Sequence, residues 1–79
     1  MFQIVRVELD AAGRVIARRA FQPLYDLFDD AMALAEFDAS RCDGDYDYDD
    51  EHECWSATHG GRQIRFMVEE AAVASDVAA

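Results

Sequence analysis

Residues 52–69 read HECWSATHGGRQIRFMVE and carry the clearest folding signal in the chain. Apolar and polar side chains alternate on both sides of Gly60-Gly61, and this dipeptide adopts the positive φ angles of a two-residue turn at no steric cost. The pattern predicts a β-hairpin in which His59 faces Arg62. Its buried side would carry Trp55, Ala57, Ile64, Phe66 and Val68, and its reverse side Cys54, Ser56, Thr58, Gln63, Arg65 and Met67.

Another hairpin is predicted upstream, from residues 2–9 and 14–21. The link Asp10-Ala11-Ala12-Gly13 suits a type I turn closed by a left-handed glycine, so Asp10 would pair with Arg14. Continuing that register gives three further pairs: Leu9 with Val15, Val7 with Ala17, and Val5 with Arg19. The apolar side chains of both strands would then share the face that packs into the core, since strand side chains alternate between faces.

Between the hairpins, the segment from Leu24 to about Cys42 has apolar residues at helical spacing. Pro23 fits the first turn of a helix, where its missing N–H costs nothing. The expected core-facing stripe consists of Leu24, Leu27, Phe28, Ala31, Leu34 and Ala35. An amphipathic helix of this kind predicts a sheet beneath it.

The segment from Asp43 to Glu51, DGDYDYDDE, has too few aliphatic residues to bury, and its like charges repel. We therefore expect a mobile acidic loop at 43–51 and a flexible C-terminal tail at 71–79. Residues 1–70 would form one small α+β domain of order ββαββ. This is a four-stranded antiparallel sheet of two hairpins with one helix packed on one face.

The charge of the 79-residue chain is concentrated in one region. It has 17 acids, 7 arginines and no lysine, a formal net charge of −10. Twelve of the acids and only one base, Arg41, lie between Asp26 and Glu53. Such a field repels phosphate backbones and attracts cations or basic proteins, so direct nucleic-acid binding is not expected.

The sequence shows no signal for membrane insertion or for secretion. No apolar stretch approaches the roughly 18–20 residues of a membrane span, and no secretory signal is visible, so a soluble cytoplasmic protein is expected. Two cysteines are too few for a disulfide framework, and both should be free thiols. The composition, rich in Ala, Arg and Asp, suggests a high-GC bacterial genome.

Metal sites match the sequence poorly. Counting Asp43 as position 1 of a calcium loop puts Tyr48 where glycine is required and Cys54 where a bidentate glutamate is required. The carboxylates of Asp43–Glu51 could still bind a divalent cation weakly. The zinc-ligand types Cys42, His52, Cys54 and His59 lack the close Cys pair of a zinc knuckle, so no metal site or cofactor is expected.

The preferred hypothesis is a protein-interaction or adaptor module without catalytic activity, because no strained nucleophile turn or phosphate-binding glycine loop is present. Its partner would be an unidentified, possibly basic protein. The open sheet face is expected to present Arg6, Arg18 and Arg65, and the acidic loop Asp43, Asp45, Tyr46, Asp47, Tyr48 and Asp49. These surfaces have opposite charge, which also suggests a homodimer in which the acidic loop of one copy contacts the arginines of another. The alternatives are a nucleic-acid mimic that inhibits a DNA-binding protein and a weak divalent-cation-binding protein that uses the Asp43–Glu51 loop.

Overall fold

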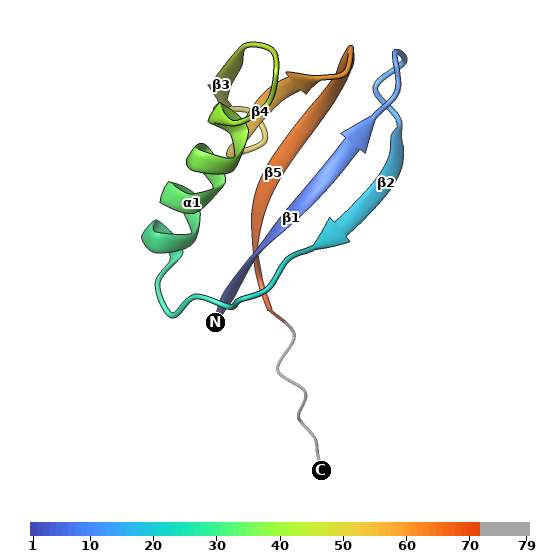
Figure 1. Ribbon diagram of the computed structural model, residues 1–79. Helices are drawn as coiled ribbons and strands as arrows, with labels where there is room; N and C mark the ends of the chain where they lie inside the picture. The colour runs from blue at the N-terminus through green and yellow to red at the C-terminus, as the bar shows by residue number, and fades with distance from the viewer. Residues whose placement is uncertain (72–79) are drawn as a thin grey trace.

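The computed structural model describes residues 1–71, which form five strands and one helix (Figure 1). Chain order is β1 (Phe2–Leu9), β2 (Val15–Ala20), α1 (Phe28–Ser40), β3 (Tyr46–Asp49), β4 (Cys54–His59) and β5 (Arg62–Glu70). The sheet order is β2-β1-β5-β4-β3, and all neighbours are antiparallel. The predicted α+β class with one helix on an antiparallel sheet is confirmed, whereas the prediction of four strands is wrong.

The fifth strand is β3, which forms inside the segment predicted to be a mobile loop. It pairs with β4, placing Tyr46 opposite Ala57 and Tyr48 opposite Trp55. The pairing extends to Gly44, whose N–H donates to the Thr58 carbonyl at 2.9 Å. The strand is ordered because the tyrosines contact Trp55, while the carboxylates alternate onto the other face, where solvent reaches them.

The helix was predicted to cover the face of β1 that carries Val5, but it covers the opposite face. Ala31, Ala35 and Ala39 are fully buried and pack with Ile4, and not with the Val5 side of the strand. Ala31 and Ala35 of the predicted stripe are thus confirmed, whereas the larger Leu27 and Leu34 are exposed and α1 begins only at Phe28. Alanines allow the helix axis to approach the sheet closely, which larger side chains at these positions would prevent.

A second apolar cluster forms on the face without the helix, called the open face below. Val5, Val7 and Leu9 are buried there beside Met67. Arg18 of β2 forms an ion pair with Glu69 of β5, and because β1 lies between these strands the pair crosses over it. The aliphatic part of the arginine can therefore shield β1 while its charged end stays wet.

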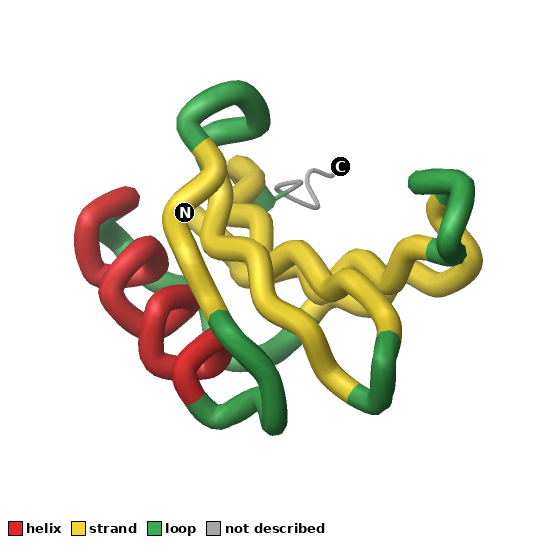
Figure 2. The backbone as a smooth tube through the Cα atoms, turned by 90° about the horizontal axis from the view of Figure 1, so that it is seen from above, coloured by secondary structure: helices red, strands yellow, loops and turns green. Residues whose placement is uncertain are grey.

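The first hairpin follows its predicted register only next to the turn. Asp10 N–H donates to the Arg14 carbonyl and Leu9 faces Val15, as expected. A bulge between Glu8 and Leu9 then shifts the pairs, so Val7 faces Arg18 in place of Ala17. The extra residue increases local twist, which accompanies the strong curl of the sheet seen from above in Figure 2.

Ala71, the first residue of the predicted flexible tail, is buried, and its N–H donates to the Met1 carbonyl at 2.8 Å. Residues 72–79, the rest of that prediction, lie outside the described part of the chain. In residues 1–71, no helix has both the length and the hydrophobicity needed to cross a membrane.

Candidate binding surface on the open face

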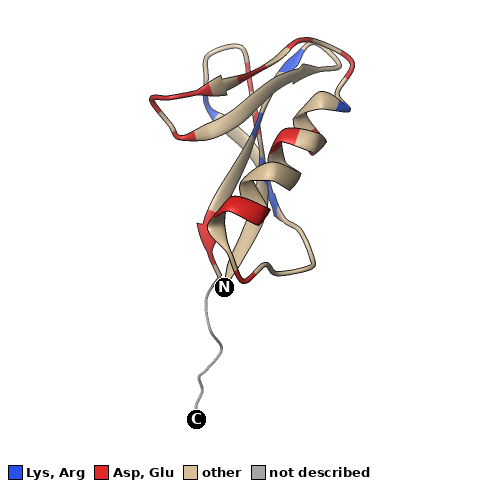
Figure 3. Cartoon of the chain, turned by 90° about the vertical axis from the view of Figure 1, so that its left-hand side faces the viewer, with Lys and Arg blue, Asp and Glu red and all other residues tan. Residues whose placement is uncertain are grey.

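The acidic segment is divided between the two faces of the sheet. Asp47 and Asp49 of β3 share the open face with their cross-strand neighbours Ser56 and Cys54. Asp45, just before β3, continues this row, because its carbonyl accepts the Thr58 N–H at 3.0 Å. Figure 3 shows the acids along α1 and around the β3 segment. β3 therefore converts a run of like charges into an ordered row of carboxylates on one face.

The strand registers show which residues lie beside this row of carboxylates on the open face. Beyond Asp47 the residues facing one another across the sheet are Ser56, Arg65, Val7 and Arg18. Beyond Asp45 they are Thr58, Gln63 and Leu9, and at the bulge in the β1–β2 pairing Ile16, and not Val15, lines the groove beside Leu9. The open face thus changes from carboxylates on β3, through hydroxyls on β4 and the polar Arg65 and Gln63 on β5, to aliphatic side chains on β1, with Arg18 beside them on β2.

A groove of about 620 Å³ occupies this part of the open face. Its walls and floor include Leu9, Ile16, Asp45, Asp47, Ser56, Thr58, Arg62 and Gln63. Arg62 donates to Glu8 at 2.6 Å, so its positive charge is already balanced within the chain. Asp45 and Asp47 form no ion pair among the described residues, and the groove therefore offers negative charge.

The tyrosines lie on the helix-covered side of β3. The ring centroids of Tyr46 and Tyr48 are 6.1 and 5.3 Å from that of Trp55. Trp55 packs against the helix-side core, in agreement with its predicted role, while the tyrosines are 44% and 37% exposed. Burial and the carboxylates around it raise the pKa of Tyr48. The predicted tyrosine–aspartate surface therefore exists as two surfaces, which face opposite sides of one strand.

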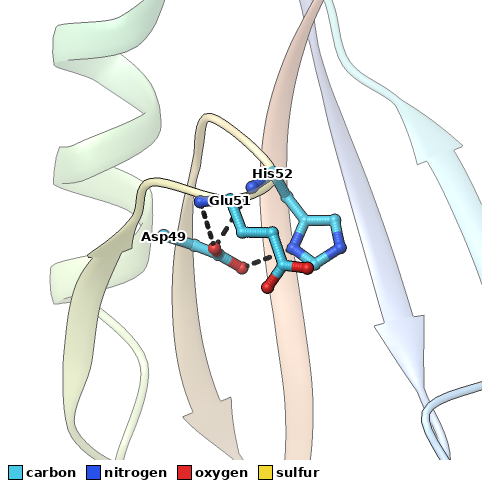
Figure 4. A group of neighbouring side chains, drawn as sticks. All are labelled: Asp49, Glu51 and His52. Carbon is cyan, nitrogen blue, oxygen red and sulfur yellow. Dashed lines mark hydrogen bonds and ion pairs between the residues drawn. The ribbon is translucent and has the colours of Figure 1, made fainter.

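Asp49 organises the turn between β3 and β4. Its Oδ1 accepts the N–H groups of Glu51 and His52 at 3.0 and 3.2 Å, and its Oδ2 lies 2.8 Å from His52 Nδ1 (Figure 4). Hydrogen bonding to His52 holds the pKa of Asp49 below its ordinary value. Arg65 Nε lies 4.0 Å from the same Oδ2, so Asp49 joins the turn electrostatically to β5.

This turn is also where metal-ligating atoms come together. One ligand atom each from Asp49, Glu51 and His52 lie within 4.8 Å of one another. Asp43 belongs to a different place, because its carboxylate accepts the Gly60 N–H at 3.2 Å. The structure thus does not gather the carboxylates of 43–51 around one point, and the expected weak cation binding stays a prediction.

The zinc-ligand types are also dispersed. His52 lies in the turn before β4, whereas His59 lies at the far end of β4, where its Nδ1 accepts the Asp43 N–H at 3.2 Å. Cys54 is fully buried and Cys42 partly buried. Burial raises the pKa of both thiols, which disfavours the thiolate form that nucleophiles and zinc ligands require.

The three predicted arginines do not share a face. Arg18 and Arg65 lie in one row on the open face, on either side of Val7, whereas Arg6 lies on the helix-covered face. Arg6 is 3.7 Å from Glu8, Arg18 pairs with Glu69, and the buried Nε of Arg65 lies 4.0 Å from Asp49 without a hydrogen-bond partner among the described residues. The grouping on one open face is therefore wrong for Arg6, because the helix covers the opposite side of β1.

No protein-family model matches the chain, and neither curated proteins nor solved structures give a match. The surface is accordingly interpreted from its geometry. The sequence predicted that Ser56 and Thr58 lie with the arginines on an open face that could bind a partner, but it did not place the acidic segment beside them. The missing signal was the tyrosine alternation in 46–49, which identifies a strand once Trp55 is recognised as its neighbour.

Proposed function

We propose that the protein is a non-catalytic interaction module that binds a positively charged segment of a partner protein through the row of carboxylates along β3. The observation that carries this function is the ordered pair Asp45 and Asp47, which meet no cationic side chain among the described residues. A cation from a partner would supply the missing charge.

Two features of the surface support a protein partner. Carboxylates fixed on a strand produce a directed negative potential, which speeds encounter with a basic partner and disfavours acidic ones. The hydroxyls of Ser56 and Thr58 lie beside the carboxylates on the open face and can donate hydrogen bonds to a partner. A small contact surface of this composition suits a transient complex.

The test is titration of the chain with an oligolysine peptide. Calorimetry measures the affinity, because Trp55, the only tryptophan, lies with the tyrosines on the helix-covered side of the sheet and not beside the carboxylates. We expect Asp45→Asn with Asp47→Asn to weaken binding about tenfold, equivalent to about 1.4 kcal/mol.

The matched control removes the same charge from the first turn of α1, by Asp29→Asn with Asp30→Asn. It should change the affinity less than about twofold, since exposed charges beyond a Debye length are screened at moderate salt. Equal losses in the two double variants would mean that net charge alone attracts the peptide, and would contradict the proposed function.

A nucleic-acid mimic is the second candidate, supported by the regular placement of the carboxylates. Asp45, Asp47 and Asp49 project from alternate residues, about 7 Å apart along the strand. A mimic should displace duplex DNA from a basic DNA-binding domain. Binding of oligolysine without any displacement of DNA would favour the first function.

The homodimer hypothesis also stays a prediction. Its arginines Arg18 and Arg65 are already engaged by Glu69 and Asp49 of the same chain. A second copy would have to replace these contacts and overcome a net charge of −10 on each chain. A dimeric mass in sedimentation at low salt would support it, and a monomeric mass would exclude it.

A further inference from the structure

The groove on the open face has a floor that cannot pair with an extended peptide. It lies on β1, β5 and β4, and each of these strands is hydrogen-bonded on both sides. A peptide strand laid in it would leave its own backbone N–H and C=O groups without protein partners. An α-helix satisfies these groups internally, so a helix is the element that this floor can accept.

The size of the groove agrees with this choice. Ile16 on β2 and Asp47 on β3 line opposite sides, four strand spacings apart, or about 19 Å measured along the sheet. A helix with its side chains is about 10–12 Å in diameter. The sheet is curled, and within residues 1–71 its one helix, α1, lies on the other face (Figure 2), so no helix of the described chain covers the open face.

The two sides of the groove differ in chemistry. On the β2 side Ile16 is 47% exposed above the buried Leu9. On the β3 side lie Asp45 and Asp47, with the hydroxyls of Ser56 and Thr58 beside them. A complementary helix has an apolar stripe on one flank and a basic stripe on the other.

We infer that the groove between β2 and β3 receives an amphipathic basic helix of the partner protein, which lies against Ile16 with its apolar stripe and against Asp45 and Asp47 with its basic stripe. This inference rests on the proposed function and specifies its ligand. The bound helix would complete a layered arrangement in which the sheet has a helix on each face.

The test compares two synthetic peptides of identical leucine and lysine composition. In one peptide the residues are spaced to form a helix with adjacent apolar and basic stripes, and in the other the order is scrambled. Calorimetry at physiological salt should give about tenfold tighter binding for the first peptide, because only its leucines can reach Ile16. Circular dichroism should show added helix in the complex.

Ile16→Asp separates groove binding from simple charge attraction. It adds a negative charge, so an electrostatic complex would tighten, whereas the amphipathic helix should bind about tenfold more weakly. Val15→Asp is the matched control, because Val15 is 57% exposed on the same strand but does not line the groove. It should leave the affinity unchanged or raise it. Far-ultraviolet circular dichroism spectra that match the wild-type spectrum verify that both variants are folded.

The inference would be overturned if the scrambled peptide bound as tightly as the amphipathic peptide. It would equally be overturned if Ile16→Asp and Val15→Asp changed the affinity for the amphipathic peptide by the same factor. It would also be overturned if the peptide perturbed the Tyr46 and Tyr48 side of β3 and not the groove. Failure of oligolysine to bind the wild-type chain is a different result, because it contradicts the proposed function itself.

Discussion

The sheet ends in two edge strands of opposite character. β2 has six exposed residues, including Val15, Ile16 and two arginines, and pairs only with β1. β3 has four residues in which tyrosine and aspartate alternate, and pairs only with β4. Charged side chains on edge strands discourage unwanted strand pairing, and the two edges use opposite charges for this. The concentration of acid in the sequence therefore becomes a difference between two edges of one sheet.

The largest expected effect comes from a glycine on the β3 side. A Cβ at Gly44 would lie 2.9 Å from the Thr58 carbonyl oxygen, so Gly44→Ala must displace the start of β3 from β4. We expect a loss of about 3 kcal/mol in the free energy of unfolding, the upper range for overpacking. Chemical denaturation followed by Trp55 fluorescence measures this loss.

Gly13→Ala in the turn before β2 is the matched control. Nothing lies within 4 Å of a Cβ there, and only the positive φ of 84° is unfavourable. The expected cost is about 1 kcal/mol. Equal losses at the two glycines would show that β3 is not tightly paired with β4.

The aromatic contacts of β3 should give the next largest effect. Tyr48→Ala removes an edge-to-face contact with Trp55 at 5.3 Å, so it should cost about 1 kcal/mol beyond the lost buried area. Ile16→Ala on exposed β2 should stay within about 0.5 kcal/mol. Denaturation of both variants provides the comparison, and a larger loss at Ile16 would reverse the assignment of which edge is packed.

The turn after β3 should make stability depend on pH. The folded pKa of Asp49 is lowered, so its stabilising contribution is present above the unfolded pKa of about 3.9 and is lost as pH falls through the folded pKa. Asp49→Asn should therefore be less stable than wild type at pH 6, with the gap closing in acid. A stability difference between Asp49→Asn and wild type that persists at the lowest pH would mean that the substitution removes packing contacts and not a charge interaction.

The smallest effect, of opposite sign, is expected at Asp38 on α1. Burial raises the pKa of its carboxyl, against the opposing influence of Arg41. Its favourable contribution is present below the unfolded pKa and is lost as pH rises through the folded pKa. Asp38→Asn should therefore stabilise the chain slightly at pH 7, by under about 0.5 kcal/mol, and not in acid. Thermal unfolding at both pH values tests this, and destabilisation at pH 7 would contradict it.

The hairpin of β4 and β5 was predictable because its signal is local. Gly60-Gly61 and strict alternation gave the pairs His59 with Arg62 and Trp55 with Phe66, both of which are present. The alternation was expected to begin at His52, but β4 begins only at Cys54, because Glu53 has a φ of 52° and belongs to the turn.

The helix face and β3 were not predictable from local patterns. Helical periodicity placed both Leu34 and Ala35 in the core-facing stripe, but only the small Ala35 is buried, because this helix approaches the sheet closely. β3 depends on Trp55, a partner outside its own segment, while its local charge is typical of a loop. The acidic residues of the surface were therefore anticipated, but their division between faces and the groove beside them required the topology.

The central claim is that a cationic segment binds at the open-face carboxylates of β3. Amide NMR spectra of the labelled chain during titration with oligolysine test it most directly. We predict saturable shifts confined to residues 45–49, Ser56 and Thr58, weakened by salt. Shifts centred on the acids of α1, or spread over all acidic positions, would contradict the claim.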